Sequence, residues 1–222
     1  METTAVRKFY LKDPGSAITH FIGMLMAMTA AWPLLLKASE VPGHLLPVTV
    51  FIVSMILLYA ASTTYHSFNL SEQGNRILKK IDHMMIFVLI AGTYTPICMI
   101  TLKDGIGPFM CALVWGIALA GIIIKAVWIY CPKWFSSVLY IGMGWVCIMG
   151  LAQILRALPP AGFAWLLAGG IIYTIGGIIY ALKLPIFNSR HKAFGSHEIF
   201  HLFVMAGSIC HFIVIYCFVA GR

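Results

Sequence analysis

The sequence contains seven long apolar runs, and each is long enough to cross a lipid bilayer as a single helix. The runs cover approximately residues 16–36, 46–68, 82–102, 107–130, 134–155, 162–182 and 197–220. A membrane-spanning helix needs about 20 consecutive, mostly apolar residues. The segments between the runs are short and carry prolines, glycines or charges, which is typical of turns. The sequence therefore predicts an all-α integral membrane protein with seven transmembrane helices.

Composition leaves no room for a soluble domain beside these helices. Of the 222 residues, 61% are hydrophobic and only 10% are charged, whereas soluble domains are about 25% charged. We therefore expect one membrane domain that covers residues 1–222. The six cysteines lie mostly inside apolar runs and show no Cys-x-x-Cys spacing. We interpret them as small core residues rather than as a disulfide framework or a thiolate metal site.

Lysine and arginine residues predict the orientation in the membrane. Eleven of them flank the side on which the chain begins, and four flank the other side: Lys37, Lys103, Arg156 and Arg222. Cytoplasmic loops carry the excess of basic residues, so we expect a cytoplasmic amino terminus and an extracytoplasmic carboxyl terminus in a multi-pass protein of the cell (inner or plasma) membrane. The net charge is +8, but the sequence has no Lys/Arg-rich run with interleaved aromatic residues. We therefore expect no nucleic-acid partner. No sequence feature specifies an oligomeric state.

Four ionisable residues from distant parts of the chain fall at the cytoplasmic end of this arrangement. His66 lies near the end of the second run, Asp82 begins the third, and His197 and His201 open the seventh. Ionisable residues inside a membrane protein are rare and tend to mark functional sites. The topology alone brings these four together, which indicates a site at the cytoplasmic end of the bundle.

The residue types and their spacing favour a metal ion. His197 and His201 are four residues apart, so they share one helix face, and His66 would supply a third imidazole. Three neutral imidazoles suit zinc and leave a coordination position open for water, as in catalytic sites, although imidazole also binds other transition metals. Asp82 would hold that water or accept its proton. Ser62 shares a face with His66 and would orient it or stabilise an oxyanion.

Each of these residues also has a simpler interpretation. A histidine at a helix end is often an interfacial polar residue. Asp82 could cap the third helix or pair with Lys79, and Ser62 could bond to its own helix backbone. His20, near the cytoplasmic end of the first run, is the main competitor as a metal ligand. We prefer the metal site because all the members converge at one end.

The remaining histidines are not expected to bind the same ion. His83 follows Asp82 but points about 100° away from it on a helix, so we interpret it as structural. His211 lies ten residues beyond His201, about 15 Å farther along the helix. His44 and His191 fall in predicted loops and receive no role.

The segment His197-Glu198-Ile199-Phe200-His201 also matches the His-Glu-x-x-His pattern of zinc proteases. In those enzymes the two histidines bind zinc and the glutamate is the general base. An intramembrane protease is therefore an alternative hypothesis. Glu198, however, points about 100° away from His197, and its charge would instead stabilise the amino terminus of the helix.

At these residues the chain resembles the hemolysin III family, the bacterial branch of the progestin and adipoQ receptor (PAQR) proteins within the CREST superfamily, which includes alkaline ceramidases. The family pattern is Ser-x-x-x-His, then Asp, then His-x-x-x-His. The matching pieces are Ser62-Thr63-Thr64-Tyr65-His66, Asp82-His83, Ala91-Gly92-Thr93-Tyr94-Thr95-Pro96, Ser196-His197-Glu198-Ile199-Phe200-His201 and Cys210-His211-Phe212.

The resemblance implies a seven-helix fold with zinc held by His66, His197 and His201, with Asp82 acting through a water and Ser62 supporting the site. It also implies that Glu198 is incidental, which weakens the protease hypothesis. The first functional hypothesis is a zinc-dependent hydrolase of lipid amides, similar to a ceramidase. The alternatives are a zinc-containing receptor, sensor or regulator of membrane energetics that hydrolyses nothing, and a cytolytic (haemolytic) or ion-conducting protein.

Overall fold

The computed structural model describes residues 10–182 and 195–222, and within these residues the elements of secondary structure are all helices. Seven spans in this part of the chain are long and apolar enough to cross a membrane, which confirms the predicted number. His191, to which no role was given, lies outside the described residues. The elements are α1 (Pro14–Ser39), α2 (Leu45–Ser67), α3 (Glu72–Pro96), η1 (Ile97–Thr101), α4 (Gly107–Val127), α5 (Lys133–Gly144), η2 (Trp145–Gly150), α6 (Leu151–Ala157), α7 (Pro160–Leu182) and α8 (Ser196–Phe218).

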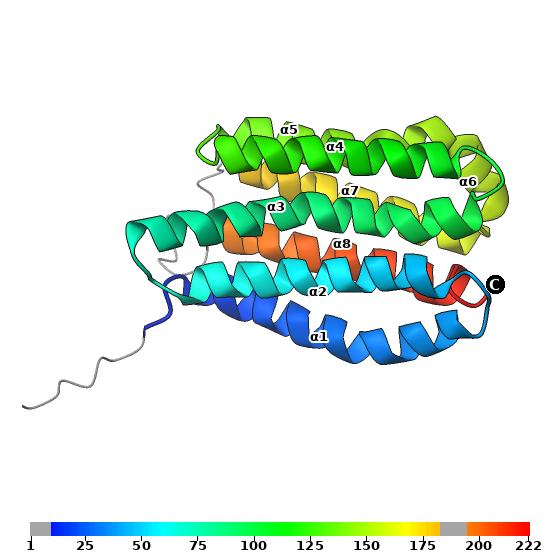
Figure 1. Ribbon diagram of the computed structural model, residues 1–222, viewed down its shortest axis with the longest axis horizontal. Coiled ribbons are helices and arrows are strands. Elements are labelled where there is room, and N and C mark those ends of the chain that lie inside the picture. Colours follow the sequence, from blue (N-terminus) through cyan, green and yellow to red (C-terminus); the bar gives the residue numbers. More distant parts are fainter. Residues whose placement is uncertain (1–9, 183–194) are drawn as a thin grey trace, which may run out of the picture.

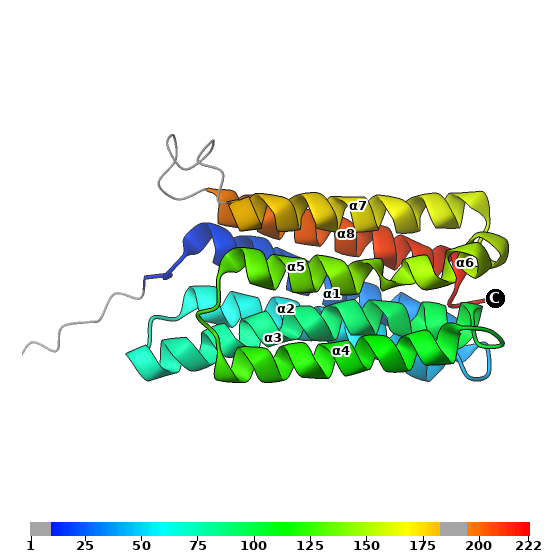
Figure 2. The same ribbon diagram turned by 90° about the horizontal axis from the view of Figure 1, so that it is seen from above.

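The long helices form an antiparallel bundle that closes on itself. α1 packs on α2, α2 on α3 and α3 on α4, while α5 packs on α7 and α7 on α8. The last helix, α8, then packs on α1, so the first and last spans are neighbours (Figures 1 and 2). The beginnings of α1, α3 and α8 and the end of α2 all lie at the same end of the bundle, on the left in Figure 1. We call this the histidine end, because His66, His197 and His201 belong to it.

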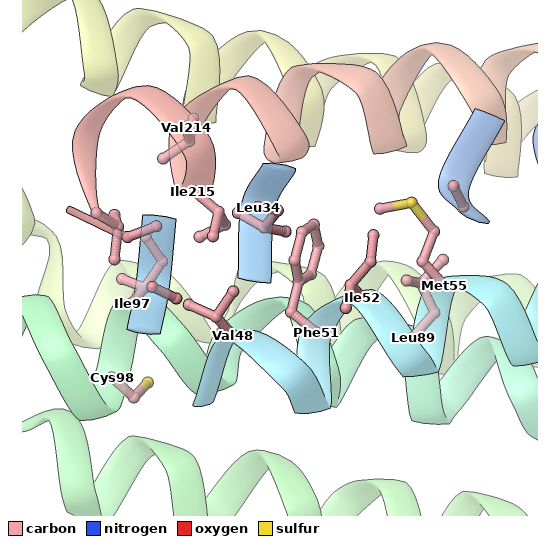
Figure 3. Packing of buried hydrophobic residues seen from close by; sticks show 14 of the residues in the cluster. Leu34, Val48, Phe51, Ile52, Met55, Leu89, Ile97, Cys98, Val214 and Ile215 are labelled. Carbon is pink, nitrogen blue, oxygen red and sulfur yellow. The ribbon is translucent and has the colours of Figure 1, made fainter. Parts of the chain in front are cut away.

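The apolar core lies between α1, α2, α3 and α8. Phe51 and Leu34 are fully buried, and Ile52, Val214 and Ile215 pack around them (Figure 3). Many other large apolar side chains are exposed on the outside of the bundle, as suits a surface that faces lipid rather than water. All six cysteines, which lie within the described residues, are free thiols. Cys98, Cys131 and Cys210 are buried, but Cys217 is exposed, so the interpretation of the cysteines as core residues does not hold for all of them.

The third helix begins earlier than the sequence predicted. Hydropathy indicated a start at Asp82, but α3 begins at Glu72 and carries a polar first half. Ser71 is the N-cap, and its side chain accepts a hydrogen bond from the backbone N–H of Gly74 at 3.2 Å. The interpretation of Asp82 as a helix cap is therefore wrong, because Asp82 lies inside the helix, where no free backbone N–H groups remain. The apolar pattern missed this segment because it identifies the lipid-facing part of a helix and not its polar extension.

The fifth span is interrupted, and a side chain from α3 compensates for the interruption. Between α5 and α6 the chain forms a 3₁₀-helix, η2, whose tighter winding disturbs the regular hydrogen bonds of an α-helix. The hydroxyl group of Tyr94 donates to the carbonyl oxygen of Gly144 at 2.6 Å and accepts from the backbone N–H of Cys147 at 2.9 Å. These bonds satisfy backbone groups inside the membrane, where water is absent.

Gly92 allows α3 to approach α2 closely. A Cβ atom at this position would lie 2.1 Å from Oγ and 2.7 Å from Cβ of Ser54 on α2. Small residues at helix crossings permit this kind of packing in membrane proteins. The absence of a side chain at residue 92 is therefore a requirement of the α2–α3 interface.

We expect Gly92→Ala to destabilise the bundle by about 1–3 kcal/mol, because overpacking forces the neighbouring side chains and backbone to move. The measurement is the midpoint of thermal unfolding of the purified protein in detergent. Gly116→Ala on α4 is the matched control, since a Cβ atom there meets nothing within 4 Å. Equal unfolding midpoints for the two variants would contradict this account of the interface.

Candidate metal centre

Three histidines from two helices meet at the histidine end. His66 lies one residue before the end of α2, and His197 and His201 lie in the first turns of α8. One potential ligand atom from each histidine lies within 4.8 Å of the other two. His66 and His201 are 3% and 2% exposed, so these imidazoles are removed from water. The structure thus gathers the residues that the sequence singled out, while their role as ligands stays a prediction.

The separation of the ring nitrogens suits a tetrahedral metal ion. Nε2 of His197 lies 3.2 Å from Nε2 of His66. Two nitrogens bound to one zinc ion at about 2.0–2.1 Å in tetrahedral geometry lie roughly 3.3 Å apart. A hydrogen bond between two neutral imidazoles would give a similar distance. A hydrogen bond between imidazoles needs only two rings. The presence of a third imidazole, from His201, beside the other two therefore favours a metal ion.

The segment before α1 holds His66 in position. Oδ2 of Asp13 accepts a hydrogen bond from Nδ1 of His66 at 2.9 Å, and the backbone N–H of Asp13 donates to the carbonyl oxygen of His66 at 2.9 Å. A proton on Nδ1 leaves the lone pair of Nε2 free for a metal. Carboxylate–histidine pairs of this kind fix the tautomer and orientation of metal ligands and raise their basicity.

α1 supports the second buried ligand as well. Nδ1 of His201 lies 3.3 Å from the carbonyl oxygen of Ser16 and 3.4 Å from the hydroxyl of Thr19. A carbonyl only accepts, so His201 donates from Nδ1 and keeps Nε2 free for the shared point. Nδ1 of His197, by contrast, is buried without a hydrogen-bond partner among the described residues. Asp13 therefore orients the imidazole of His66, and the backbone carbonyl of Ser16 orients that of His201.

Glu198 stabilises the start of α8. Its carboxylate accepts from the backbone N–H of Gly195 at 2.8 Å and from the hydroxyl of Ser16 at 2.6 Å. Both oxygens are therefore engaged with the start of α8 and with α1, as expected for an acidic residue in the first turn of a helix. This arrangement agrees with the structural interpretation of Glu198 and speaks against a role as the general base of a protease.

His20, the competing ligand, is not part of the three-histidine group. Its ring lies parallel to that of His201, with 3.7 Å between the ring centroids and 7° between the planes. Neither of its ring nitrogens has a hydrogen-bond partner among the described residues. His20 therefore covers one face of the His201 ring. Residue spacing could not indicate this contact, because the two histidines lie on different helices.

Asp82 and Ser62 lie beside the three histidines. Asp82 is 7% exposed and stays outside the group of direct ligands. Its Oδ2 atom lies 3.4 Å from Nδ1 of the adjacent His83, and no ion pair with Lys79, the alternative partner, is found among the described residues. Ser62 does not bond to its own helix, since its hydroxyl is buried without a partner among the described residues. Both side chains therefore keep hydrogen-bonding capacity for a bound molecule.

A cavity of about 160 Å³ opens from this polar end into the bundle. His20, Ser62, Asp82, His197 and His201 line it at the histidine end. Farther along, its walls are mainly apolar, and they include Leu89, Leu166, Val204, Met110 and Ile154. The last two belong to the opposite end of the bundle, where α4 begins and α6 ends. The cavity thus joins a polar end to a long apolar interior.

Lys12 is a basic residue at the histidine end. Nζ of Lys12 donates to the carbonyl oxygen of Tyr65 at 3.1 Å and lies 3.5 Å above the ring of that tyrosine. Partial burial lowers the pKa of the Lys12 ammonium group, and the carboxylates of Asp13 and Asp82 oppose this shift.

Sequence reasoning missed Asp13 and Ser16. The available signal was topological, because Asp13 directly precedes the first apolar run and so falls at the same end as His66. No spacing pattern links Asp13 to His66, because the two residues are 53 positions apart in the sequence.

Fold and site together define a class: a multi-pass helical membrane protein with a candidate three-histidine metal centre at one end of an apolar cavity. Residues 9–212 match the family described as Haemolysin-III related. The chain belongs to this family, as the resemblance of its motifs predicted, and it is an integral protein of the plasma membrane.

Relatives in bacteria cover almost the whole chain. The chain is 36% identical over 219 residues to Hemolysin-3 of Bacillus cereus, which covers 97% of this chain and 95% of the relative. It is 37% identical over 214 residues to the Hemolysin-3 homolog of Bacillus subtilis (strain 168), with 94% and 96% covered. The adiponectin receptor protein of Drosophila melanogaster is a more distant relative, 22% identical over 197 residues, with 73% of this chain and 40% of the receptor covered.

We expect Asp13→Ala to weaken metal binding about 10- to 100-fold, because an unsupported imidazole is less basic and less well oriented. The measurement is the zinc dissociation constant of the purified protein, obtained by competition with a chelator. Asp104→Asn serves as the control, since Asp104 is an exposed carboxylate in the turn before α4, at the other end of the bundle. Equal zinc affinities in wild type and Asp13→Ala would show that the Asp13–His66 contact has no influence on the metal.

Proposed function

We propose that this protein is a zinc-dependent hydrolase of lipid amides, similar in chemistry to a ceramidase. The observation that carries the proposal is the position of the three histidines, with two Nε2 atoms 3.2 Å apart, at the polar end of a cavity whose walls are mainly apolar. A centre made for structural zinc would be closed by a fourth protein ligand, whereas three protein ligands and an open position are typical of catalytic zinc. The group of potential direct ligands contains three residues among those described.

His66, His197 and His201 would hold the metal. When bound, zinc supplies Lewis acidity and lowers the pKa of a coordinated water molecule to about 7. The supporting contacts from Asp13 and from the carbonyl of Ser16 suit this role, since they present the unprotonated Nε2 atoms of His66 and His201.

Ser62 and Asp82 would act on the substrate. The hydroxyl of Ser62, buried without a partner, would donate a hydrogen bond to the carbonyl oxygen of the amide and stabilise the negative charge that develops there. The carboxylate of Asp82 would accept a proton from the attacking water and return it to the leaving nitrogen as the C–N bond breaks. Proton transfer by a positioned side chain of this type contributes about 10²- to 10⁴-fold to a rate.

The shape of the cavity favours a single acyl chain. Its volume is about 160 Å³, which leaves room for a slender ligand only. Spread between the histidine end and Met110 near the opposite end, this volume makes a narrow passage. A linear hydrocarbon chain suits such a passage better than a bulky ring system. The amide headgroup would then lie beside the three histidines.

The basic residues favour a cytoplasmic position for the metal centre. Arg76, Lys79 and Lys80 belong to α3 at the histidine end, and Lys12 and Lys133 lie beside the starts of α1 and α5. The positive-inside rule would put this end in the cytoplasm. A released fatty acid or amine would then leave toward the cytoplasmic leaflet or the cytosol.

We expect the purified protein to contain about one zinc ion per chain, as three-histidine catalytic sites do, and to release fatty acid from a long-chain N-acylsphingosine. Elemental mass spectrometry measures the metal, and mass spectrometry of extracted lipids measures the product. His197→Ala/His201→Ala should lose both. A folded wild-type protein without metal, when purified without chelator, would refute the proposal. Bound zinc without hydrolysis of any lipid amide would support a receptor or sensor instead.

We expect Gly170→Leu to block lipid entry while leaving the metal centre intact. Gly170 lines the cavity, and a Cβ atom at this position meets nothing within 4 Å, so a leucine side chain would occupy the open space. The measurement is fatty-acid binding beside zinc content. Gly116→Leu is the matched control, because Gly116 is exposed on α4 and its Cβ position is equally free. Unchanged lipid binding in Gly170→Leu would contradict the proposed lipid position.

A further inference from the structure

A polar atom without a hydrogen-bond partner, Nδ1 of His211, lies deep in the apolar part of the cavity. His211 lines the cavity and is 8% exposed, and its Nδ1 atom has no partner among the described residues. It lies on α8 ten residues beyond His201, which corresponds to about 15 Å along the helix. His211 is therefore too far away to take part in the metal centre.

Packing fixes the ring of His211 but gives its Nδ1 atom no hydrogen-bond partner among the described residues. The ring stacks on that of Tyr173 from α7, with 5.2 Å between the centroids and 22° between the planes. On another side, a Cβ atom at Gly169 would lie 2.9 Å from Nε2 of His211, so the backbone of α7 approaches the ring closely. The imidazole is thus held at the cavity wall by contacts that leave Nδ1 unpaired.

The other polar side chains in this part of the cavity are already engaged within the protein. The hydroxyl of Tyr173 shares a hydrogen bond of 2.9 Å with Ser208. The indole N–H of Trp145 donates to the hydroxyl of Thr174 at 3.0 Å, which itself donates to a backbone carbonyl. The hydroxyl of Tyr94 is likewise satisfied. Among the polar side chains in this part of the cavity, His211 is the one with a buried atom, Nδ1, that has no hydrogen-bond partner among the described residues.

An unpaired polar group in an apolar environment is energetically unfavourable, and ionisable residues inside membranes tend to be functional. A ligand that offers one hydrogen-bonding group at this depth would remove that cost. A neutral histidine presents one donor and one acceptor nitrogen, and a hydroxyl group can pair with either, whichever tautomer is present. Since the neighbouring walls are apolar, the ligand would carry a single polar group there rather than a polar headgroup such as a sugar.

We propose that the cavity binds acyl lipids whose chain carries a hydroxyl group near its middle, and that His211 recognises this hydroxyl. The inference rests on the proposed function, because the amide or carboxyl end of the lipid would lie at the three histidines. The distance of about 15 Å between His201 and His211 then sets the position of the hydroxyl along the chain. His211 is a specificity-determining residue in this account and not a catalytic one.

The test compares two fatty acids that differ only in the mid-chain hydroxyl. Stearic acid and its counterpart with one hydroxyl near the middle of the chain compete against a fluorescent fatty acid for the purified, zinc-loaded protein in detergent. The wild type should bind the hydroxylated acid about tenfold more tightly, since a hydrogen bond in an apolar cavity contributes about that factor. His211→Leu should bind both acids equally, whereas His211→Asn, which keeps a polar atom near the position of Nδ1, should retain a preference.

The outcomes separate this inference from the proposed function. Equal binding of the two acids by the wild type would overturn the role of His211 and leave lipid binding in the cavity intact. This result is expected if an ordered water molecule, and not the ligand, pairs with His211. A preference that persists in His211→Leu would overturn it as well. Binding of neither acid by the wild type would overturn both proposals. Zinc content and the midpoint of thermal unfolding show whether each variant is folded. If a variant does not fold, the comparison of the two acids on the wild type still tests whether the mid-chain hydroxyl is recognised.

Discussion

The absence of water inside the membrane governs the arrangement of this protein. Backbone groups in the hydrocarbon region must be satisfied within helices, and seven such helices span the described part of the chain. Where a span becomes irregular, as at η2, the hydroxyl of Tyr94 takes over the backbone bonds. The same constraint makes each unpaired polar side chain informative, because a group that the protein leaves unsatisfied is available to something else.

The candidate metal centre depends on contacts between the two ends of the sequence. α8 supplies His197 and His201, and it packs on α1. The segment that leads into α1 supplies Asp13 to His66, while Ser16 bonds to Glu198 and faces His201. The three-histidine cluster is therefore stabilised by the packing of α8 on α1, and loss of this contact would disturb the cluster even though its members lie on α2 and α8.

The cavity places unused hydrogen-bonding capacity at two depths. Toward the histidine end this capacity belongs to His20, Ser62, Ser137 and Nδ1 of His197, and in the apolar interior it belongs to Nδ1 of His211. Between them the walls are apolar or internally bonded. This distribution suits an elongated amphipathic ligand that is recognised at its polar end and at one further point along its chain, with a narrow volume that limits its width.

The sequence by itself determined the membrane fold, the number of spans and the common end of His66, Asp82, His197 and His201. Hydropathy and residue order carry this information, because the bilayer fixes helix length and direction. Only the tertiary structure decided that α3 begins ten residues before Asp82, that Asp13 supports His66, and that His20 stacks on His201. It also decided that His211 faces a cavity. These features depend on packing between helices far apart in sequence, and no local pattern records which faces of those helices meet.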